Sequence, residues 1–350
     1  MRAALVLLLW AVLSVSAGAQ DWATAEVCSV DTPVLSDEAF APAMLTDLER
    51  EADKIPISKG KFWQITSPEG RVSYLWGTYH SSDPLILRLP DRVRDAIEAS
   101  RAVAVEIDYT FKSREAYRAA QMMDGRFLEA SDPFAFEPGD GTVAGLSQKV
   151  SNWVRDRAME LGWTEDFDLI MSLPGMAEML LSDPCEDFSE GVLPIQDDYV
   201  QLLGRLAGAE IIGLERPDDF VTDLAADEDT ALAIVGVYAA YLRPMSSNAE
   251  RSSSFALYLQ GRLGVMEAWD YAYQREVHGA KGLEMLRLTD AYLLDFRNRR
   301  FLDRLAGELP RGGVFIAVGS AHLPGQTGLV TRLREMGYDV TRVVLPGEVE

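Results

Sequence analysis

The chain has 350 residues, of which 48% are hydrophobic, and it carries 55 acidic against 33 basic side chains, a formal net charge of −22. This length and apolar fraction are sufficient for a large folded core. The acidic surplus argues against a protein that binds nucleic acid or anionic lipid, because clustered lysine and arginine hold both of these ligands.

The first residues have the pattern of a cleavable secretory signal peptide. Arg2 provides a positive charge, residues 3–15 form an apolar segment, and Ala17-Gly18-Ala19 is a small-residue cleavage site. The apolar segment is shorter than the roughly 20 residues that a membrane-spanning helix needs. We therefore expect residues 1–19 to be removed by a cut after Ala19, which leaves a periplasmic or secreted protein without a membrane span.

Two cysteines, Cys28 and Cys185, are the only ones in the chain. Export would place them where a disulfide persists, and such a bond would tie the N-terminal segment to the middle of the chain. The alternative is two free thiols. Metal binding by the pair is disfavoured, because neither cysteine belongs to a CxxC motif.

An N-terminal extension, residues 20–60, precedes the expected folded domain, residues 61–350. The extension contains an amphipathic pattern that predicts a helix over Ser36–Lys54 with the serine as its N-cap. The domain begins with two β-rich segments, Lys61–Thr66 and Val72–Trp76, which a Pro-Glu-Gly turn joins. They predict a β-hairpin whose second strand leads into the first of two histidine motifs.

The four-residue frame GxxH occurs twice, at Gly77–His80 and at Gly319–His322, and uses two of the three histidines. Each copy follows an apolar run and precedes a proline-containing loop, a helical pattern and another apolar run. Glycine lets the backbone turn or approach a ligand closely, and residues beyond strand ends face the crevice where α/β sheets bind ligands. The repetition favours a ligand platform, strand–GxxH–loop–helix–strand, over histidines that only cap turns or pack in the core.

A carboxylate interrupts the apolar run that closes the first unit. Glu106 lies in the predicted strand Ala102–Ile107, and a carboxylate in a buried strand is costly unless it is paired or bound to a metal. The alternative is an acid at the strand end that faces solvent, as Asp108 just beyond it would. We favour a functional role for Glu106.

The remaining elements are predicted from periodicity and breakers. Residues 113–185 have a mostly helical pattern with a loop at Phe136–Gly141, and their methionines Met171, Met176 and Met179 are interpreted as core packing. The other expected elements are a helix over Asp91–Ser100, a loop over Asp187–Ile195, a helix over Gln196–Ala207, a strand within Gly208–Gly213, helices over Glu228–Leu242, Ser254–Val277 and Leu286–Leu309, a strand from Val314, a helix ending at Met336 and a strand over Val340–Leu345.

Three arginines, Arg297, Arg300 and Arg304, recur at helical spacing in the last long helix. They are either a solvated basic face or a source of an arginine directed at a bound oxyanion or carboxylate. The third histidine, His278, lies in the polar stretch HGAKG, and we interpret it as a surface residue without a catalytic role.

Two histidines and one carboxylate at strand ends are a set that can hold a divalent metal with open positions. A metal in such a site lowers the pKa of bound water and polarises a carbonyl, which is hydrolytic chemistry. Without a metal, the same groups could act as general base and orienting acid. A third possibility is that the histidines ligate a porphyrin.

The chain resembles the TraB/GumN family, whose animal relatives are the TIKI membrane proteases and whose wider superfamily includes erythromycin-esterase-like and ChaN-like haem-binding proteins. The resemblance extends from Phe62 to Leu345. It depends on the motifs LWGTYH at Leu75–His80, VAVEID at Val103–Asp108, GLE at Gly213–Glu215, RN at Arg297–Asn298, and VGSAHLPGQTGLVTRLREMGY at Val318–Tyr338.

The resemblance implies a metal-dependent peptidase that uses His80, His322 and Glu106, with Arg297 in the active cavity. The sequence departs from many relatives at Phe296, where they have an acidic residue before the arginine. Any role of that acid as a partner is therefore absent. The ChaN-like branch implies a different outcome, haem binding on a similar fold.

We therefore expect a single α/β domain with a central mixed sheet flanked by helices. Its predicted function is that of an exported hydrolase, a peptidase acting on a peptide or small-molecule substrate and dependent on manganese, cobalt or zinc. The expected site residues are the metal ligands His80, His322 and Glu106, the last as third ligand or general base, Arg297 as a substrate or oxyanion contact, and Gly77, Gly319, Asn298 and Glu215. The alternatives are a non-catalytic protein that binds haem or another small ligand, and a metal-independent esterase-like hydrolase.

Overall fold

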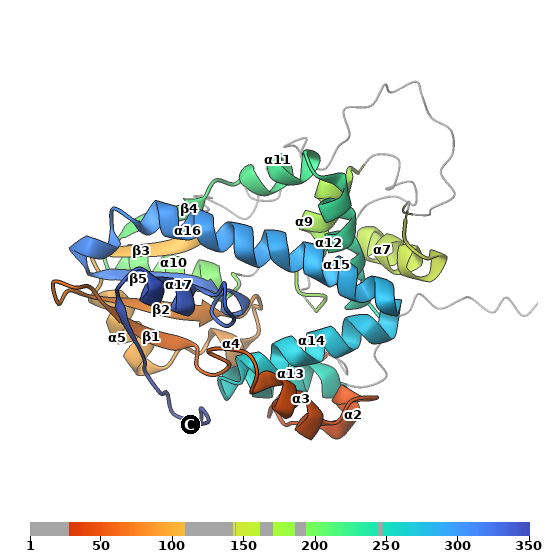
Figure 1. The fold of residues 1–350 in the computed structure, drawn as a ribbon, viewed down its shortest axis with the longest axis horizontal. Helices are drawn as coiled ribbons and strands as arrows, with labels where there is room; N and C mark the ends of the chain where they lie inside the picture. The colour runs from red at the N-terminus through yellow and green to blue at the C-terminus, as the bar shows by residue number, and fades with distance from the viewer. Residues whose placement is uncertain (1–27, 109–142, 144, 162–170, 186–193, 244–247) are drawn as a thin grey trace, which may run out of the picture.

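The computed structural model describes residues 28–108, 143, 145–161, 171–185, 194–243 and 248–350. Its centre is one six-stranded sheet in the order β4-β3-β5-β2-β1-β6 (Figure 1). The strands are β1 (Phe62–Thr66), β2 (Val72–Thr78), β3 (Ala102–Ile107), β4 (Glu210–Glu215), β5 (Val314–Gly319) and β6 (Asp339–Arg342). Strands β4, β3, β5 and β2 are parallel, and β1 is antiparallel to both β2 and β6. The predicted α/β fold with a mixed sheet is confirmed.

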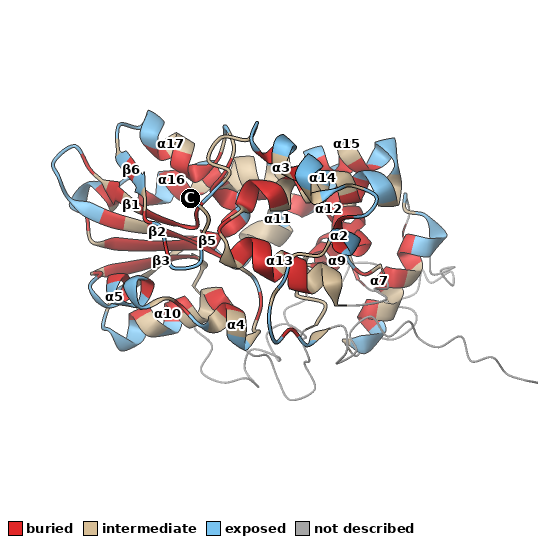
Figure 2. Cartoon of the chain, turned by 90° about the horizontal axis from the view of Figure 1, so that it is seen from below, coloured by how far each residue is buried: buried red, intermediate tan, exposed pale blue. Residues whose placement is uncertain are grey.

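Helices cover both faces of the sheet (Figure 2). One face carries α4 (Pro84–Leu87), α5 (Asp91–Glu98) and α10 (Gln196–Leu206), and the other carries α16 (Arg297–Leu305) and α17 (Leu329–Glu335). This arrangement explains why β5 is apolar throughout and buried at every position, since a parallel strand between two helical layers has no face in contact with water.

A second group of helices lies beside the sheet, on the right in Figure 1. Its members are α7 (Gln148–Glu160), α9 (Leu173–Leu180), α11 (Asp219–Ala225), α12 (Glu228–Ala240), α13 (Ala249–Leu259), α14 (Leu263–His278) and α15 (Ala280–Asp290). Several of them share a hydrophobic core of their own that contains Trp153, Val154 and Ile234. Met171, Met176 and Met179 are buried in this core, which confirms their predicted packing role.

One long helical rod connects the two parts of the molecule. It consists of α15, the π-helix η1 (Ala291–Phe296) and α16. The first section packs on α12 and α14, whereas α16 packs on β4. A π-helix is wider than an α-helix and turns the following residues onto a different face. In place of the single helix predicted over Leu286–Leu309, the structure has a rod that begins at Ala280, ends at Leu305 and is interrupted by the π-helix.

Two other predicted helices are each divided in the structure. The helix expected over Ser36–Lys54 consists of α2 (Asp37–Phe40) and α3 (Leu45–Ala52), because Pro42 has no backbone N–H and cannot continue a helix. The helix expected over Ser254–Val277 is interrupted between α13 and α14 at Gly261, which has a φ of +69° that glycine adopts readily. The proposed N-cap Ser36 makes no capping hydrogen bond through its side chain.

Cys28 and Cys185 are joined by a disulfide. Among the described residues, no helix is long and apolar enough to cross a membrane. The predicted signal peptide, the loop at Phe136–Gly141 and nearly all of the loop at Asp187–Ile195 lie outside the described residues.

Candidate functional site

The two histidine motifs and Glu106 lie at the same edge of the sheet. His80 follows the end of β2, His322 follows the end of β5, and Glu106 is the penultimate residue of β3. These three strands are parallel neighbours, and Thr78 at the end of β2 is in register with Gly319 at the end of β5. Because parallel neighbours end at the same edge, the register brings the three side chains together.

The side chains of His80, Glu106 and His322 lie close to the backbone of Gly319. A Cβ atom built on Gly319 would lie 3.0 Å from Nε2 of His80, 3.3 Å from Oε1 of Glu106 and 3.6 Å from Cδ2 of His322. The backbone N–H of Gly319 donates a hydrogen bond of 2.6 Å to Oε1 of Glu106. The glycine of the second motif is therefore required for close approach, since any side chain would occupy the space between the three groups.

The glycine of the first motif has a different role. A Cβ atom on Gly77 would lie 3.0 Å from the Cα atom of Ser320 and 3.0 Å from the side chain of Leu323. Gly77 thus allows the two motifs to pack directly against each other.

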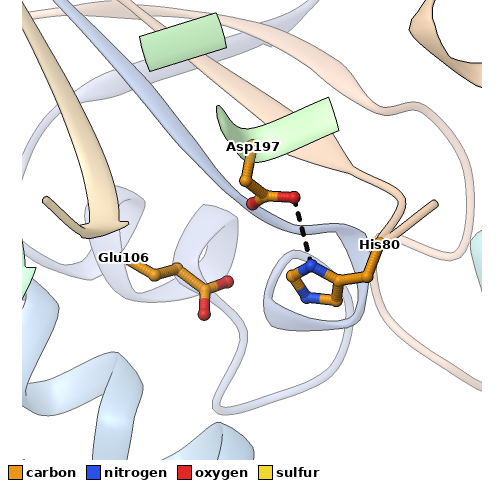
Figure 3. A group of neighbouring side chains, drawn as sticks. All are labelled: His80, Glu106 and Asp197. Carbon is orange, nitrogen blue, oxygen red and sulfur yellow. Dashed lines mark ion pairs between the residues drawn. The ribbon is translucent and has the colours of Figure 1, made fainter. Parts of the chain in front are cut away.

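His80 is held through its Nδ1 atom. This nitrogen lies 3.1 Å from Oδ2 of Asp197 (Figure 3). The other oxygen of Asp197 accepts a 2.7 Å hydrogen bond from the hydroxyl of Thr78. Burial acts to lower the pKa of His80, but the carboxylates of Asp197 and Glu106 outweigh it and hold that pKa above its usual value. Because 48% of the side chain is exposed, solvent screens these charges and can reach the ring.

His322 is held through the same ring atom by a neutral partner. Its Nδ1 lies 2.8 Å from Oδ1 of Asn298, while the amide nitrogen of Asn298 donates to the carbonyl oxygens of His322 and Thr327 at 3.3 and 3.1 Å. The amide oxygen must therefore accept from the ring, which places the proton of a neutral His322 on Nδ1. Nε2 then presents its lone pair to Oε1 of Glu106 at 3.6 Å. Burial lowers the pKa of His322 to about 3, despite the attraction of Glu106.

An ion-pair ladder fixes the other side of Glu106. Nη2 of Arg297 lies 2.7 Å from Oε2 of Glu106 and 2.7 Å from Oε2 of Glu215, and Arg300 lies 3.1 Å from Oε1 of Glu215. Burial alone would raise the pKa of Glu106, but Arg297 and the two histidines outweigh it and lower that pKa well below its usual range. Arg297 is only 11% exposed, so it does not belong to a solvated basic face.

A hollow of ≈ 580 Å³ opens behind this ladder. Glu215 and Arg300 form part of its wall, together with Asp108 beyond β3 and Gly213 in β4. Its size is in the range of small-molecule sites, and it lies at the carboxyl ends of two parallel strands.

The structure brings most of the predicted site residues into one cluster. The members are His80, Glu106, Glu215, Arg297, Asn298, Gly319 and His322. His278 lies elsewhere, at the end of α14, where Nε2 is 3.0 Å from the carbonyl oxygen of Gly236. The sequence reasoning missed Asp197, since an acid in the first turn of a helix is ordinary there and nothing in the sequence relates it to His80.

The donor atoms at this edge fit a divalent metal ion. One ring nitrogen of His80, one oxygen of Glu106 and one oxygen of Asp197 lie within 4.8 Å of one another. In addition, Nε2 of His322 and Oε1 of Glu106 face each other at 3.6 Å, although Asn298 already accounts for the ring proton. Two facing acceptors without a proton between them are favourable when a cation is shared. Imidazole with carboxylate is a donor set typical of zinc, cobalt and manganese.

The family model of the TraB/PrgY/gumN family matches residues 61–342, which contain all the strands and every residue of the cluster. Searches of the curated proteins and of the solved structures gave no significant match.

Proposed function

The chain belongs to the TraB/PrgY/gumN family, and from that premise we propose that it is an exported metal-dependent hydrolase. The proposed ligands are Nε2 of His80, Nε2 of His322 and Oε1 of Glu106. The observation that carries this proposal is that both histidines have Nδ1 engaged by an oxygen, at 3.1 Å for Asp197 and 2.8 Å for Asn298. Metal-binding histidines are held in this way, because the outer partner fixes the tautomer and the direction of the ring.

A divalent ion bound there would supply a Lewis acid that acidifies bound water and polarises a carbonyl. The protein's own residues would position the ligands and contact the substrate. Arg297 holds Oε2 of Glu106 and thereby keeps Oε1 directed at the histidines. Nη1 of Arg297 makes no hydrogen bond to the described residues, and we assign it to a substrate oxygen. The exposed edge of His80 is the side from which water and substrate would enter.

Among possible substrates we favour peptides, because the paired GxxH motifs resemble those of TIKI-type peptidases. The haem-binding alternative has no support from the geometry. Nε2 of His80, Oε1 of Glu106 and Cδ2 of His322 lie 3.0 to 3.6 Å from the position that a Cβ atom of Gly319 would take, and a carboxylate grouped so closely with imidazoles favours a metal ion. The metal-independent alternative predicts activity that survives chelation.

Export is part of the proposal. It is supported by the signal-peptide pattern that ends at Ala19 and by the disulfide between Cys28 and Cys185, because disulfides persist mainly in oxidising compartments. N-terminal sequencing of the protein recovered from the periplasm or medium should begin at Gln20. A chain that retains Met1 in the cell would contradict this part.

The decisive experiment is metal analysis of the purified mature protein, followed by calorimetric titration of the metal-free form with manganese, cobalt and zinc. The His80→Ala/His322→Ala double variant should lose the bound metal. The matched control is His278→Ala, which removes the one histidine outside the cluster and should leave binding unchanged. A quenched-fluorescence peptide library with and without chelator then tests hydrolysis. Equal binding by the wild type and the double variant would overturn the metal proposal.

A further inference from the structure

The first turn of α10 contacts the first histidine motif at several positions. Oε1 of the buried Gln196 accepts hydrogen bonds from the backbone N–H of Tyr79 at 3.2 Å, from Nε1 of Trp76 at 3.3 Å and from the hydroxyl of Tyr258 at 2.7 Å. Its amide nitrogen donates to the carbonyl oxygen of Ile86. Gln196 therefore holds a side chain before the motif, the backbone within it and the backbone after it.

The next residue of the helix fixes the histidine ring itself. Asp197 accepts the hydroxyl of Thr78 at Oδ1, and its Oδ2 lies 3.1 Å from Nδ1 of His80. Oδ2 is buried, and apart from this 3.1 Å ion-pair contact it has no hydrogen-bond partner among the described residues. The carboxylate is thus held by one motif residue and directed at another.

The second motif has a matching arrangement with a different residue type. Asn298 is the second residue of α16, as Asp197 is the second residue of α10. Each places one side-chain oxygen against Nδ1 of a GxxH histidine. The neutral amide of Asn298 shows that an acceptor oxygen without a negative charge is sufficient at the second motif.

We propose that Asp197 is the positioning residue of His80: it keeps the ring proton on Nδ1, so that Nε2 is directed at the site above Gly319. This inference rests on the proposed function insofar as Nε2 is taken to bind a metal. The competing role for Asp197 is that of a direct ligand, since one of its oxygens lies within 4.8 Å of a ring nitrogen of His80 and an oxygen of Glu106. Oδ1, however, is occupied by Thr78 and Oδ2 faces Nδ1.

The two roles predict different results for a pair of substitutions. Asp197→Ala removes the acceptor and should weaken the binding of manganese, cobalt and zinc by about 10- to 100-fold, the usual effect of losing an outer partner. Asp197→Asn retains an acceptor oxygen like that of Asn298 and should restore most of the affinity. A direct ligand would not be replaced by an amide, so equal losses in both variants would overturn the proposal.

The matched control is Asp198→Asn, measured well above the pKa of about 6 to which burial raises this carboxyl group. There it removes one negative charge from the next residue of the same helix turn, while an amide oxygen can still accept from the backbone N–H of Ile195. The metal affinity of this variant measures the effect of losing one nearby negative charge. The metal affinity of Asp197→Asn should equal it. Thermal unfolding of all three variants tests whether any loss of affinity accompanies loss of the fold. The Asn variant keeps the experiment decisive even where the Ala variant is destabilised.

A second readout needs neither metal nor substrate. The chain has three histidines, so long-range ¹H–¹⁵N spectra of metal-free protein labelled on histidine can resolve each ring. At a pH high enough for the rings to be neutral, His80 should carry its proton on Nδ1, and Asp197→Ala should shift it towards Nε2 while His322 and His278 keep their spectra. An unchanged His80 tautomer in that variant would refute the positioning role. If the tautomers are as expected but the protein binds no metal, the positioning role stands and only the proposed function is refuted.

Discussion

Two buried groups of charged side chains lie at the same end of the sheet, and they differ in how completely their charges are matched. In the first, Lys61, just before β1, contacts Glu348 at 2.9 Å and the carbonyl oxygen of Leu259 at 2.9 Å. The other oxygen of Glu348 contacts Arg342 at 3.1 Å. We call these three charged residues the C-terminal cluster. In it, each charge has an opposite charge in contact.

The proposed metal ligands His80, His322 and Glu106, which we call the metal-site cluster, are less completely matched. Arg297 satisfies Oε2 of Glu106, but Nε2 of His322 faces Oε1 at 3.6 Å with its proton already assigned to the far nitrogen. Removing one partner from a matched buried cluster is strongly destabilising, because it leaves a buried charge without compensation. A cluster with facing lone pairs has a position for a cation. The comparison therefore predicts that stability and metal binding depend on different clusters at one edge of the same sheet.

The substitution with the largest expected effect removes the acid of the C-terminal cluster. Glu348 is fully buried and is the common partner of Lys61 and Arg342. Glu348→Gln should lower the free energy of unfolding by about 3–5 kcal/mol, because it leaves buried positive charges without a partner. Urea denaturation measures this loss. Metal affinity of the folded fraction should not change, and a large loss of affinity would show that the two clusters are not separate.

The corresponding change in the metal-site cluster should have a large effect on metal affinity and a small effect on the free energy of unfolding. Glu106→Gln should weaken metal binding by at least about 100-fold, since it removes an anionic ligand. Its effect on the free energy of unfolding should be about 1–2 kcal/mol, because Arg297 keeps Glu215 as a partner at 2.7 Å. Calorimetry and urea denaturation measure the two quantities on the same sample. A stability loss as large as that of Glu348→Gln would make Glu106 structural.

The two motif glycines offer a smaller test of the same separation. Gly319 has a φ of −47°, which alanine tolerates, so Gly319→Ala introduces a methyl group between His80 and Glu106 without backbone strain. Metal affinity should fall by at least about 10-fold with a change in unfolding free energy below about 1 kcal/mol. Gly77→Ala, where the methyl group meets Ser320 and Leu323, should instead cost about 1–3 kcal/mol of stability through overpacking. Equal profiles for the two variants would contradict these separate roles.

Much of the sheet and of the metal-site cluster could be predicted because the signals are local. Short β-rich apolar runs bounded by turn residues predicted the strands, and the repeated GxxH frame singled out His80 and His322. Glu106 was found because a carboxylate in an apolar strand is unusual. Breaks at Pro42 and Gly261 were also readable, and overlooking them joined helices that the structure divides.

The remaining features depend on tertiary contacts that no local pattern encodes. Asp197 becomes a partner of His80 only because α10 packs across the ends of β3 and β5. The π-helix between Ala291 and Phe296 exists where one rod must face the helical core on one side and the sheet on the other. The sequence could not show whether Arg297 faces solvent or the site, because helical spacing alone does not show which face of a helix is covered.

A third group of charges, in the helical part of the molecule, extends the comparison to a cluster of one sign. Asp290 at the end of α15 is near Asp270 and Glu267 of α14 and Asp295 of η1, and burial followed by these acids raises its pKa to about 8. Burial raises the pKa of Asp270 to about 6, although the hydroxyl of Tyr241 donates to it. Among the described residues, no cation lowers the pKa of either acid, so any negative charge on them is unmatched there.

Asp290→Asn tests the energetic consequence. A carboxyl group whose pKa is raised on folding holds its proton more tightly in the native state, so its contribution to stability is lost as pH rises from the unfolded value of 3.8 to about 8. The variant should therefore be more stable than wild type at pH 9, by at least about 1 kcal/mol, and equal to it near pH 4. Urea denaturation across this range measures the difference. Parallel pH profiles for the two proteins would show that Asp290 ionises normally, and that this part of the protein tolerates unmatched charge because water reaches it.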